Sequence, residues 1–584
     1  MPVERNYVPS NADIARTLLR IRTLMELAGE SFYKFTAYER AASTIENAAP
    51  VAELIAAGEL TKLPGVGKSI AAAIEEIVRT GSSAALEDLQ KRFPSTIFEV
   101  LGVSGIGIKT AALLLDQFGI ASLADLERAV DDGTLAEAPR MGKKTVENIK
   151  RGILAYKGRS QRTPLARALI IAREVMDYLR AEVAFDRLAI AGSLRRAEVT
   201  VGDVDIVCTT PQAPLAIERF VAWERARAVL AEGPTKASIW LDDGLQIDLR
   251  VLPDHVYGNL MQHFTGSREH NIQLREYAVR KGLRVSENGI LDLESGNVTV
   301  CRDESAVYET LGMQFIPPEL RSGLGEIDLA IGRRLPDLVT LDSIQGDFHM
   351  HCTWSDGRAA LEDMIAAAAR RGYAYHSISD HSQGRGPKYG LAAAELSEQR
   401  SIVREIGNRY GIRTLCSSEV DILPDGSLDF SDSQLAELDI VVASIHSAMN
   451  LSRDEMTKRL IRACENPYVN IVGHPTGRMI GGFPGYEFDY DAVFSAAART
   501  GTALEIDGQA LRLDLPAELA RRAKEFGVMF TVDSDAHDVA GLENIELALG
   551  QARRAGLTAA DILNTRGLDD VLQFVRAKRE MVKT

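Results

Sequence analysis

The sequence predicts a multidomain chain: an all-α region, then a mixed α/β core, then a parallel (β/α)7-type barrel. Its 584 residues are too many for one hydrophobic core, since a domain takes roughly 150 residues. Apolar residues recur at helical spacing up to about residue 155, short strands alternate with helices from about 165, and seven strand–helix units follow residue 341. The predicted boundaries are 1–157, 158–335, a linker at 336–344, and 345–584.

The composition is that of a water-soluble chain. Hydrophobic residues make up 46% and charged residues 26%, as in ordinary globular proteins. No window reaches the ~18 consecutive apolar residues that a bilayer span needs, and the first residues do not resemble a secretion leader. Five scattered cysteines without a CxxC pair argue against a disulfide framework. We therefore expect a cytoplasmic protein without a membrane partner.

The net charge of −15 argues at first sight against a nucleic-acid partner. The excess of acid is concentrated in residues 341–584, which carry 26 Lys and Arg against 36 Asp and Glu. Residues 1–157 carry 19 against 20 and are close to neutral. Local basic faces therefore remain possible in the first region, and bound cations could offset part of the acid in the last one.

Three glycine-containing turns precede helices in the first region. They lie in LPGVGKSIAAAIEEI (63–77), VSGIGIKTAALLLDQFG (103–119) and, more weakly, PRMGKKTVENIKRGI (139–153). One such turn is usually only a turn, but three within about 90 residues resemble helix-hairpin-helix elements. Glycine allows close approach of a ligand, and the helix start offers free N–H groups to a phosphate. The predicted contacts with a DNA backbone are Gly65, Gly67, Lys68, Gly105 and Gly107.

Three aspartates and a Gly-Ser turn are the main features of the middle region. Asp203 and Asp205 lie two apart in a strand and therefore point to one face, and Asp248 on another strand could join them. Converging carboxylates suit two divalent cations that activate an attacking hydroxyl and stabilise a leaving pyrophosphate. An exposed edge strand with solvated acids is the alternative. GSLRR (192–196), which is suited to binding a triphosphate, favours the metal site.

Together with HFTGSREHN (263–271), these motifs resemble the catalytic core of family X DNA polymerases, in the nucleotidyltransferase superfamily, over residues from about 10 to 335. The resemblance implies that the three aspartates hold two Mg²⁺ or Mn²⁺ ions and that Asp248 accepts the proton of the primer 3′-hydroxyl. It assigns nucleotide binding to Arg162, Gly192, Ser193, Arg196, Gly202 and Asn271, a contact with the template to Arg275, and binding of a gap's 5′-phosphate to Lys34 and Tyr38.

Two positions depart from the family pattern. The family's Tyr-Phe before TGS is His263-Phe264 here, which leaves discrimination against ribonucleotides open. The lysine that acts as a sugar-phosphate lyase nucleophile in some relatives falls on Ala73, and an alanine cannot form a Schiff base. Lyase activity of that type is therefore not expected, although Lys68 lies nearby.

Six histidines lie at predicted strand ends beyond residue 341, together with three acids. On successive strands of one barrel they would meet at its C-terminal mouth. Mixed imidazole and carboxylate donors suit Zn, Mn or Fe, and nine donors suit a cluster of two or three ions. The predicted ligands are His349, His351, Asp356, His381, Glu419, His446, His474, Asp535 and His537. We interpret His376 as structural.

The motifs HxH…D, SDHS, SSEVDIL, SIHS, GHP and DSDAH resemble the polymerase and histidinol phosphatase (PHP) domain, over residues 345 to about 575. All nine ligand positions of that pattern carry suitable residue types, so the resemblance implies an intact phosphoesterase site with a Mn²⁺ or Zn²⁺ cluster. Cys352 stands where relatives often have threonine, and we expect little effect from it.

The order of hairpins, polymerase core and PHP barrel resembles that of bacterial family X polymerases across nearly the whole chain. It implies a DNA polymerase that fills short gaps in DNA repair, uses dNTPs and gapped or broken duplex DNA, and carries a metal-dependent 3′–5′ exonuclease. Such a protein would associate with the nucleoid. The alternatives are a barrel that acts as a phosphatase or apurinic endonuclease, and a non-catalytic scaffold that binds DNA ends.

Overall fold

A computed structural model gives the fold, and it describes residues 11–46, 51–103, 106–137, 162–241, 244–386 and 389–581, with single residues and pairs in between. The contacts divide the chain into two units. Most of the first unit comes from Met1–Thr163, Ile171–Arg195 and Val201–Arg334, and most of the second from Leu335–Thr584. None of the described helices is long and apolar enough to cross a membrane.

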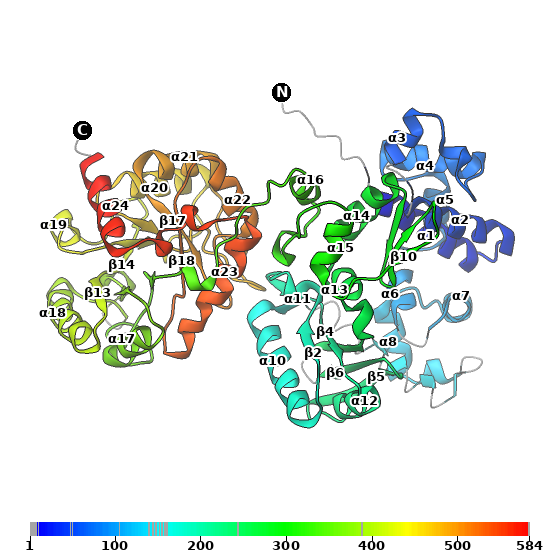
Figure 1. Cartoon of the computed structure of the whole chain (residues 1–584), viewed down its shortest axis with the longest axis horizontal. Coiled ribbons are helices and arrows are strands. Elements are labelled where there is room, and N and C mark those ends of the chain that lie inside the picture. The colour runs from blue at the N-terminus through cyan, green and yellow to red at the C-terminus, as the bar shows by residue number, and fades with distance from the viewer. Residues whose placement is uncertain are drawn as a thin grey trace. The chain divides into compact units, whose positions relative to one another are not determined.

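Among the described residues of the N-terminal region, all regular elements are helices, as predicted (Figure 1). Apolar side chains at helical spacing, such as Ile14, Leu18, Ile74 and Leu114, are buried in one shared hydrophobic core. The helices are α1 (Asn11–Leu27), α2 (Phe32–Glu46), α3 (Val51–Ala56), α4 (Lys68–Thr80), α5 (Ala84–Arg92), α6 (Ile97–Gly102), α7 (Ile108–Phe118) and α8 (Leu123–Asp131).

Two of the predicted hairpin turns lead directly into helices. Gly67 immediately precedes α4 and Gly107 immediately precedes α7, and no side chain caps either helix start. The first N–H groups of both helices therefore remain available to a ligand. Gly65 has φ +82°, a conformation that favours glycine. Gly105 and most of the third turn lie outside the described residues.

A five-stranded sheet forms the centre of the α/β core. Its order is β2-β4-β7-β6-β5, in which β4 and β7 are parallel and the other pairs antiparallel. The strands are β2 (Arg187–Ile190), β4 (Asp203–Thr209), β5 (Ala226–Glu232), β6 (Lys236–Leu241) and β7 (Gln246–Val251), with a separate pair β1 (Thr163–Pro164) and β3 (Thr200–Val201). The helices are α10 (Leu165–Glu182), α11 (Gly192–Arg195) and α12 (Ala213–Val221).

A helical subdomain with a small antiparallel sheet follows the core. It comprises α13 (Tyr257–Thr265), α14 (Arg268–Arg280), β8 (Leu283–Ser286), β9 (Gly289–Asp292), β10 (Val298–Thr299), α15 (Glu304–Thr310) and α16 (Glu326–Ile331). Glu304 links it to α11, because its carboxylate accepts hydrogen bonds from both terminal nitrogens of Arg195 and lies 2.5 Å from Nη1 of the buried Arg321. Charge-assisted bonds of this kind hold the two parts in register.

The second unit is built from parallel strands, as predicted. They are β11 (Gly346–Asp347), β12 (Tyr375–Ile378), β13 (Arg413–Cys416), β14 (Glu419–Asp421), β15 (Val442–Ser444), β16 (Ile471–Val472), β17 (Ala503–Asp507) and β18 (Phe530–Asp533). One sheet has the order β11-β12-β13 and the other β14-β15-β16-β17-β18. Two residues separate β13 from β14, so the eight segments correspond to the seven predicted strands.

Isolated parallel bridges join the two sheets at both edges. One bridge pairs His381 with Glu419 and the other pairs Met350 with Ala536, so the strands run in a closed ring. Both β17 and β18 are buried along their whole length, as expected for strands covered on one face by helices and facing the barrel interior on the other.

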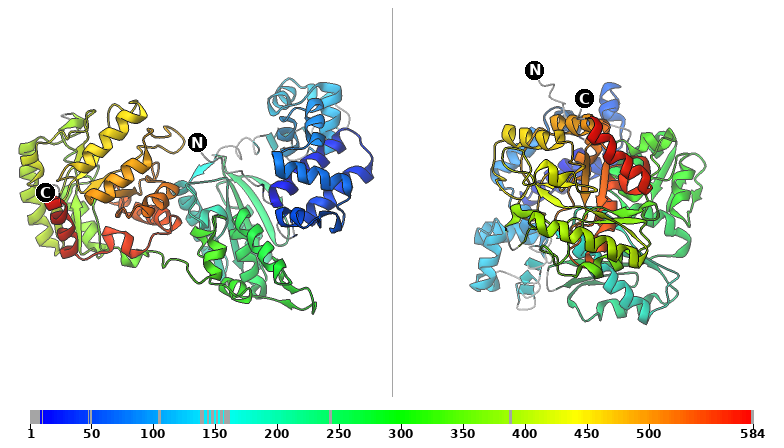
Figure 2. Two further views of the ribbon diagram at one scale, coloured as in Figure 1. Left: turned by 90° about the horizontal axis from the view of Figure 1, so that it is seen from above. Right: turned by 90° about the vertical axis from the view of Figure 1, so that its left-hand side faces the viewer.

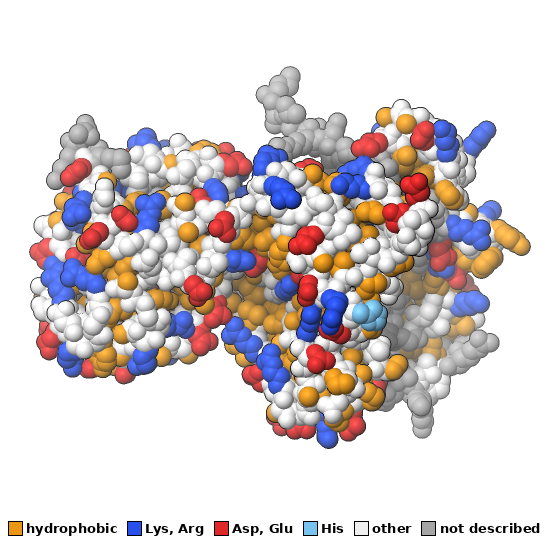
Figure 3. Space-filling view, viewed as in Figure 1, with side chains coloured by type: hydrophobic (Ala, Val, Ile, Leu, Met, Phe, Trp, Pro, Cys, Tyr) orange, Lys and Arg blue, Asp and Glu red, His pale blue; other side chains and the backbone are white. Residues whose placement is uncertain are grey.

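Helices lie outside the strands of this unit (Figure 2). They are α17 (Leu361–Arg370), α18 (Ala393–Tyr410), α19 (Asp432–Leu435), α20 (Arg453–Glu465), α21 (Tyr490–Thr500), α22 (Ala517–Glu525), α23 (Ile545–Arg554) and α24 (Leu568–Met581). On the face shown in Figure 3, basic and acidic side chains are interspersed. The loops that follow the C-terminal ends of the strands carry the second candidate site.

Two candidate metal centres

Three aspartates come together on neighbouring strands of the first unit. Asp203 and Asp205 lie two apart on β4, and Asp248 on β7 is the direct parallel partner of Asp205. All three side chains therefore project from the same face of the sheet. Burial raises the pKa of Asp205 to about 7, and the charges of Asp203 and Asp248 add to the effect. A cluster of this kind needs positive charge to be fully ionised, as a divalent cation would supply.

Polar groups already surround this cluster. The ammonium of Lys236 lies 3.1 Å from Oδ2 of Asp248, and the side chain of Gln246 donates to Oδ1 at 2.7 Å. Gly192 has φ +62°, and a Cβ added there would lie 2.2 Å from Oδ2 of Asp205. Glycine is therefore the residue that lets the Gly-Ser turn approach the aspartates so closely.

The other predicted nucleotide ligands lie in or near the loops around β3 and β4. Ser193 is half-buried in α11, Gly202 separates β3 from β4, and Arg162 is exposed just before β1. The guanidinium of Arg196 lies 3.6 Å from Glu198.

Asn271 and Arg275 of α14 both contact His263, the residue at which the sequence departs from the family pattern. The amide of Asn271 donates to the His263 carbonyl at 2.9 Å, and Arg275 Nη2 lies 3.3 Å from the His263 ring nitrogen Nδ1. Burial lowers the pKa of His263, and the charge of Arg275 lowers it further. His263 is thus a neutral side chain at neutral pH, held by the two predicted DNA and nucleotide contacts.

Lys34 and Tyr38 lie on α2. Lys34 is exposed and forms an ion pair with Glu30 at 2.9 Å, whereas Tyr38 is buried. Tyr38 lines a cavity of about 690 Å³ that also contacts Ser69, Ala73 and Arg79 of α4. The described lining of this cavity contains no lysine, so Ala73 leaves it without a Schiff-base nucleophile.

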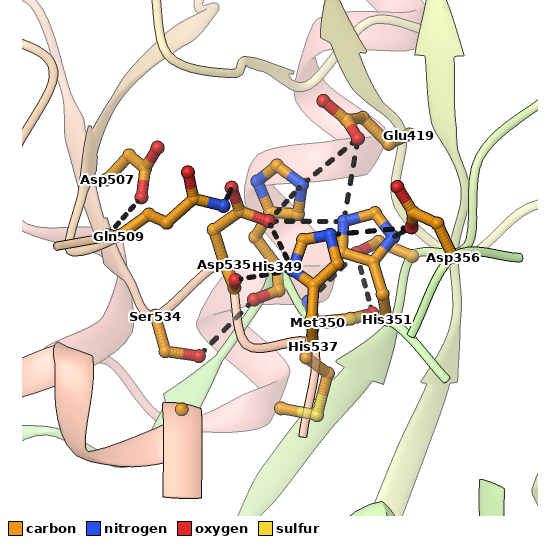
Figure 4. Close-up of polar contacts among 12 residues, drawn as sticks. His349, Met350, His351, Asp356, Glu419, Asp507, Gln509, Ser534, Asp535 and His537 are labelled. Atoms are coloured by element: carbon orange, nitrogen blue, oxygen red, sulfur yellow. Dashed lines mark hydrogen bonds and ion pairs between the residues drawn. The ribbon is translucent and has the colours of Figure 1, made fainter. Parts of the chain in front are cut away.

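The second centre gathers side chains from around the barrel (Figure 4). Among the described residues, three groups of potential ligands have donor atoms within 4.8 Å of one another. They are His351, Asp356, His381 and His537; His349, His351 and Asp535; and His381, Glu419 and His446. His351 and His381 each belong to two groups, so the three groups form one continuous cluster that fits more than one cation.

His351 and Glu419 are central to this cluster. The His351 ring nitrogen Nε2 lies 3.2 Å from Asp535 and 3.5 Å from Glu419, and neither ring nitrogen makes a hydrogen bond with the described residues. His381 lies 2.9 Å from Glu419 and 3.2 Å from Asp356. Buried nitrogen atoms without partners are expensive, and a metal ion would satisfy them.

His474 is the one predicted ligand outside the three groups. Its Nε2 lies 2.7 Å from the Glu419 carboxylate, close to His446, whose Nε2 is 3.3 Å from the same oxygen. All nine predicted ligands therefore lie at the same end of the barrel. His376 lies apart from the groups and contacts Thr414 instead.

Two acids that the sequence analysis did not single out orient the histidines. Glu505 on β17 accepts from the His349 ring at 2.7 Å and from the His474 backbone N–H at 2.6 Å. Asp421 on β14 lies 2.6 Å from Nδ1 of His446. Such partners fix which ring nitrogen faces the metal. The sequence signal was present for Asp421, which lies within the motif SSEVDIL.

The protonation states of Glu419 and His351 suit metal binding, whereas His349, His381, His446 and His537 must each release a proton when a cation binds, because neighbouring carboxylates raise their pKa values despite burial. Burial opposes ionisation of Glu419, but the charges of His381, His446 and His349 hold its pKa well below the usual range. Burial lowers the pKa of His351 to about 4, with a further contribution from His537. An ionised carboxylate and a neutral imidazole are the forms that bind a cation.

The fold and the two centres define a DNA-binding helical region joined to a nucleotidyltransferase-type core and a metal-binding parallel barrel. Family models of a helix-hairpin-helix domain, a SAM-like helix-hairpin-helix tandem and the DNA polymerase beta thumb match residues 9–83, 97–153 and 260–322. Among curated proteins, the chain is 35% identical to the DNA polymerase/3′-5′ exonuclease PolX of Bacillus subtilis (strain 168), over 97% of this chain and 99% of that protein. The chain belongs to the PolX family of bacterial family X polymerases, as the sequence motifs predicted.

The barrel has relatives of its own. A probable phosphatase of Thermoanaerobacter sp. (strain X514) is 31% identical over 40% of this chain and 96% of its own length. A probable phosphatase of Syntrophotalea carbinolica is 30% identical over 39% of this chain and 95% of its own length. A barrel of this type therefore also occurs without a polymerase core.

Proposed function

We propose that the chain is a DNA polymerase that fills short gaps and removes 3′-terminal nucleotides with its barrel. Family membership over nearly the whole chain supports both activities. The observation that carries the polymerase is the pairing of Asp205 with Asp248 beside the Gly-Ser turn. The matches to helix-hairpin-helix and thumb models support DNA binding. The substrate we propose is duplex DNA with short gaps, as formed during DNA repair.

In the first centre, Asp203, Asp205 and Asp248 would hold two divalent cations, which we propose to be Mg²⁺ or Mn²⁺ because all the donors are hard carboxylate oxygens. Bound there, the cations would favour ionisation of the primer hydroxyl and neutralise the triphosphate. Ser193, Arg196 and the backbone of the turn at Gly192 would bind the triphosphate oxygens, and Asp248 would accept the hydroxyl proton.

In the second centre, the nine predicted ligands would hold two or three cations. Mixed imidazole and carboxylate donors favour Mn²⁺ or Zn²⁺. The cations would polarise a phosphodiester and supply an activated water. Glu505 and Asp421 keep His349 and His446 oriented, so their role is to position ligands rather than to touch the substrate.

A 5′-labelled primer on a one-nucleotide gapped duplex tests both activities. With Mn²⁺ and dNTPs, the wild type should extend the primer, and Asp205→Ala should lose extension only. Without dNTPs, the wild type should shorten the primer, and His351→Ala should lose shortening only. Loss of both activities in either single variant would contradict two separate centres. Absence of both from the wild type would leave only a role in binding DNA ends.

The phosphatase relatives favour one alternative, in which the barrel hydrolyses small phosphomonoesters. Two substrates distinguish the phosphatase from the nuclease: p-nitrophenyl phosphate is a phosphomonoester, and p-nitrophenyl thymidine 5′-monophosphate is a phosphodiester. Faster turnover of the diester supports the nuclease. Turnover of the monoester alone, with no primer shortening, supports the phosphatase.

A further inference from the structure

Asp356 is the predicted ligand of the second centre that lies farthest along the chain from a strand. The other eight predicted ligands lie on a strand or within four residues of its end, whereas Asp356 comes nine residues after β11 ends at Asp347. Its carboxylate lies 3.2 Å from His381 and 3.4 Å from His537, on the side of His351 in Figure 4. Contacts other than those of the sheet must therefore hold Asp356 in place.

Asp356 belongs to a turn, residues 352–357, that is wrapped around Cys352. The Cys352 carbonyl accepts hydrogen bonds from the backbone N–H groups of Ser355 at 3.1 Å and Gly357 at 3.0 Å. A Cβ added at Gly357 would lie 2.6 Å from the backbone nitrogen of Cys352, so only glycine allows this close approach. The position of Asp356 therefore depends on what holds Cys352 and Ser355.

The carboxylate of Asp380 holds both of these residues. Asp380 is fully buried and directly precedes His381. Its Oδ1 accepts hydrogen bonds from the Cys352 backbone N–H at 2.9 Å and from the Ser355 hydroxyl. Its Oδ2 accepts hydrogen bonds from the Cys352 thiol at 2.8 Å and from the side-chain amide of Gln399 at 2.5 Å. Asp380 thus joins the turn 352–357 to the end of β12 and to α18.

The carboxylate of Asp380 is not placed as a metal ligand. Asp380 belongs to none of the three groups of potential ligands found among the described residues. Four donors already contact its two oxygens, about as many as a carboxylate can accept. A buried polar group whose partners are all in place fixes the geometry of those partners. The contacts of Asp380 are therefore those of a residue that orients others.

The two histidines beside this network have supports of their own. The His351 backbone N–H donates to the Ala536 carbonyl at 2.7 Å. An isolated parallel bridge pairs His381 with Glu419. Loss of the network would therefore displace Asp356 more than either histidine.

We propose that Asp380 is a positioning residue, which holds the turn 352–357 and thereby completes one cation site of the cluster. Asp356 belongs to only one of the three groups of potential ligands, the one with His351, His381 and His537. That site should depend on Asp380, and the other two should not. The presence of cations rests on the proposed function, whereas the hydrogen bonds of Asp380 do not. The competing explanation is that Asp380 only stabilises the barrel as a whole.

The test uses the full-length chain with Asp205→Ala as the reference, so that the first centre binds metal weakly. Asp380→Ala removes all four contacts, Asp380→Asn keeps one accepting oxygen, and Ser355→Ala removes a single contact from the turn. Asp356→Ala shows the loss of the site itself. Ser427→Ala is the matched control, because Ser427 is also a half-buried serine whose hydroxyl donates to an aspartate, at 2.6 Å.

Three quantities are measured for each variant. Elemental analysis gives the number of Mn²⁺ ions bound per chain, and isothermal titration calorimetry gives their affinities. The unfolding temperature in a chelator reports what each side chain contributes to stability without metal.

Asp380→Ala and Asp356→Ala should each bind one Mn²⁺ ion fewer than the reference, with the remaining ions bound equally tightly. Ser355→Ala should weaken the same ion about ten- to a hundredfold, the range for partners that orient metal ligands. Asp380→Asn should keep that ion, because its oxygen can still accept from the turn once Gln399 rotates its amide. Ser355→Ala added to Asp356→Ala should cause no further loss, since both act on one site. Ser427→Ala should match the reference.

Unchanged Mn²⁺ number and affinity in both Asp380→Ala and Ser355→Ala would overturn the proposal. An equal loss of affinity for every ion would also overturn it, because it would show a general effect on the barrel. If Asp380→Ala does not fold, Ser355→Ala decides, and a normal affinity for every ion in that variant overturns the proposal. A reference chain that binds Mn²⁺ in the expected pattern but never shortens DNA would refute the exonuclease and leave the role of Asp380 standing.

Discussion

At the scale of single residues, Asp205 makes the first centre sensitive to pH. Its pKa of about 7 in the folded chain lies above the ordinary value of 3.8. Between these values the unfolded chain releases the proton and the folded chain keeps it, so the metal-free fold loses stability as pH rises from about 4 to 7. Asp205→Asn should therefore be more stable than the wild type at pH 8, by on the order of 3 kcal/mol.

Thermal unfolding in a chelator at pH 5 and pH 8 checks this prediction. The exposed Asp177, paired with Arg180 on α10, provides the control, and Asp177→Asn should change stability little at either pH. Mg²⁺ should reduce the difference in unfolding temperature between the wild type and Asp205→Asn, because the cation relieves the repulsion among the three aspartates. If the stabilities of the wild type and Asp205→Asn differ by the same amount at both pH values, Asp205 is not the titrating group.

Glu505 allows a test of how much the orientation of the ligands contributes to metal binding, because it contacts predicted ligands without being one itself. Its carboxylate contacts the His349 ring and the His474 backbone. Glu505→Gln keeps the shape and removes the charge, and we expect about ten- to a hundredfold weaker metal affinity without unfolding. Competition with a chelating dye measures it. Glu465→Gln, at an exposed ion pair with Arg499, should bind metal as the wild type does. Unchanged affinity in Glu505→Gln would be inconsistent with this role.

At the scale of elements, the first hairpin contains two glycines, Gly65 and Gly67, that differ in backbone conformation and in the space around them. Gly65 has φ +82°, and a Cβ there would lie 3.3 Å from the Arg40 Cβ, so Gly65→Ala should cost about 1–2 kcal/mol of stability. Gly67 has φ −80° and open space around it, so Gly67→Ala should fold normally. If the turn binds a DNA backbone, the added methyl group of Gly67→Ala should weaken binding to gapped DNA.

Denaturation and fluorescence anisotropy with a gapped duplex separate these effects. The expected pattern is loss of stability in Gly65→Ala, and loss of DNA affinity with unchanged stability in Gly67→Ala. Unchanged DNA affinity in Gly67→Ala would argue that this turn does not contact the phosphates.

Much of this architecture was predictable from elements that carry strong local patterns. Histidine motifs at successive strand ends predicted a barrel mouth, and the spacing of Asp203 and Asp205 predicted one face of a strand. Glu505 and Asp421 were missed because their contacts depend on which side chain faces which neighbour across the barrel. Local periodicity contains no information on such long-range contacts. The break between β13 and β14 was missed for the same reason.

At the scale of the whole molecule, metal binding should stabilise the second unit. Its cluster concentrates buried acids and histidines, and some of the donor atoms, including both ring nitrogens of His351, have no hydrogen-bond partner among the described residues. A cation at a hundred times its dissociation constant stabilises a fold by about 2.7 kcal/mol. Calorimetry should therefore show that EDTA lowers the unfolding temperature of one transition by several degrees. His351→Ala should lose much of that response. An EDTA effect that is identical in His351→Ala would place the stabilising metal elsewhere.

The closure of the barrel also bears on the order in which the chain becomes competent during its synthesis. The first strand of the ring pairs with the last through Met350 and Ala536, and the predicted ligands Asp535 and His537 lie beside that seam. A ribosome releases the three aspartates of the first centre almost three hundred residues before these last ligands. A nascent chain can therefore contain the predicted polymerase centre well before its nuclease centre is complete, and truncation between residues 335 and 535 would remove the last predicted ligands of the nuclease centre while keeping the three aspartates.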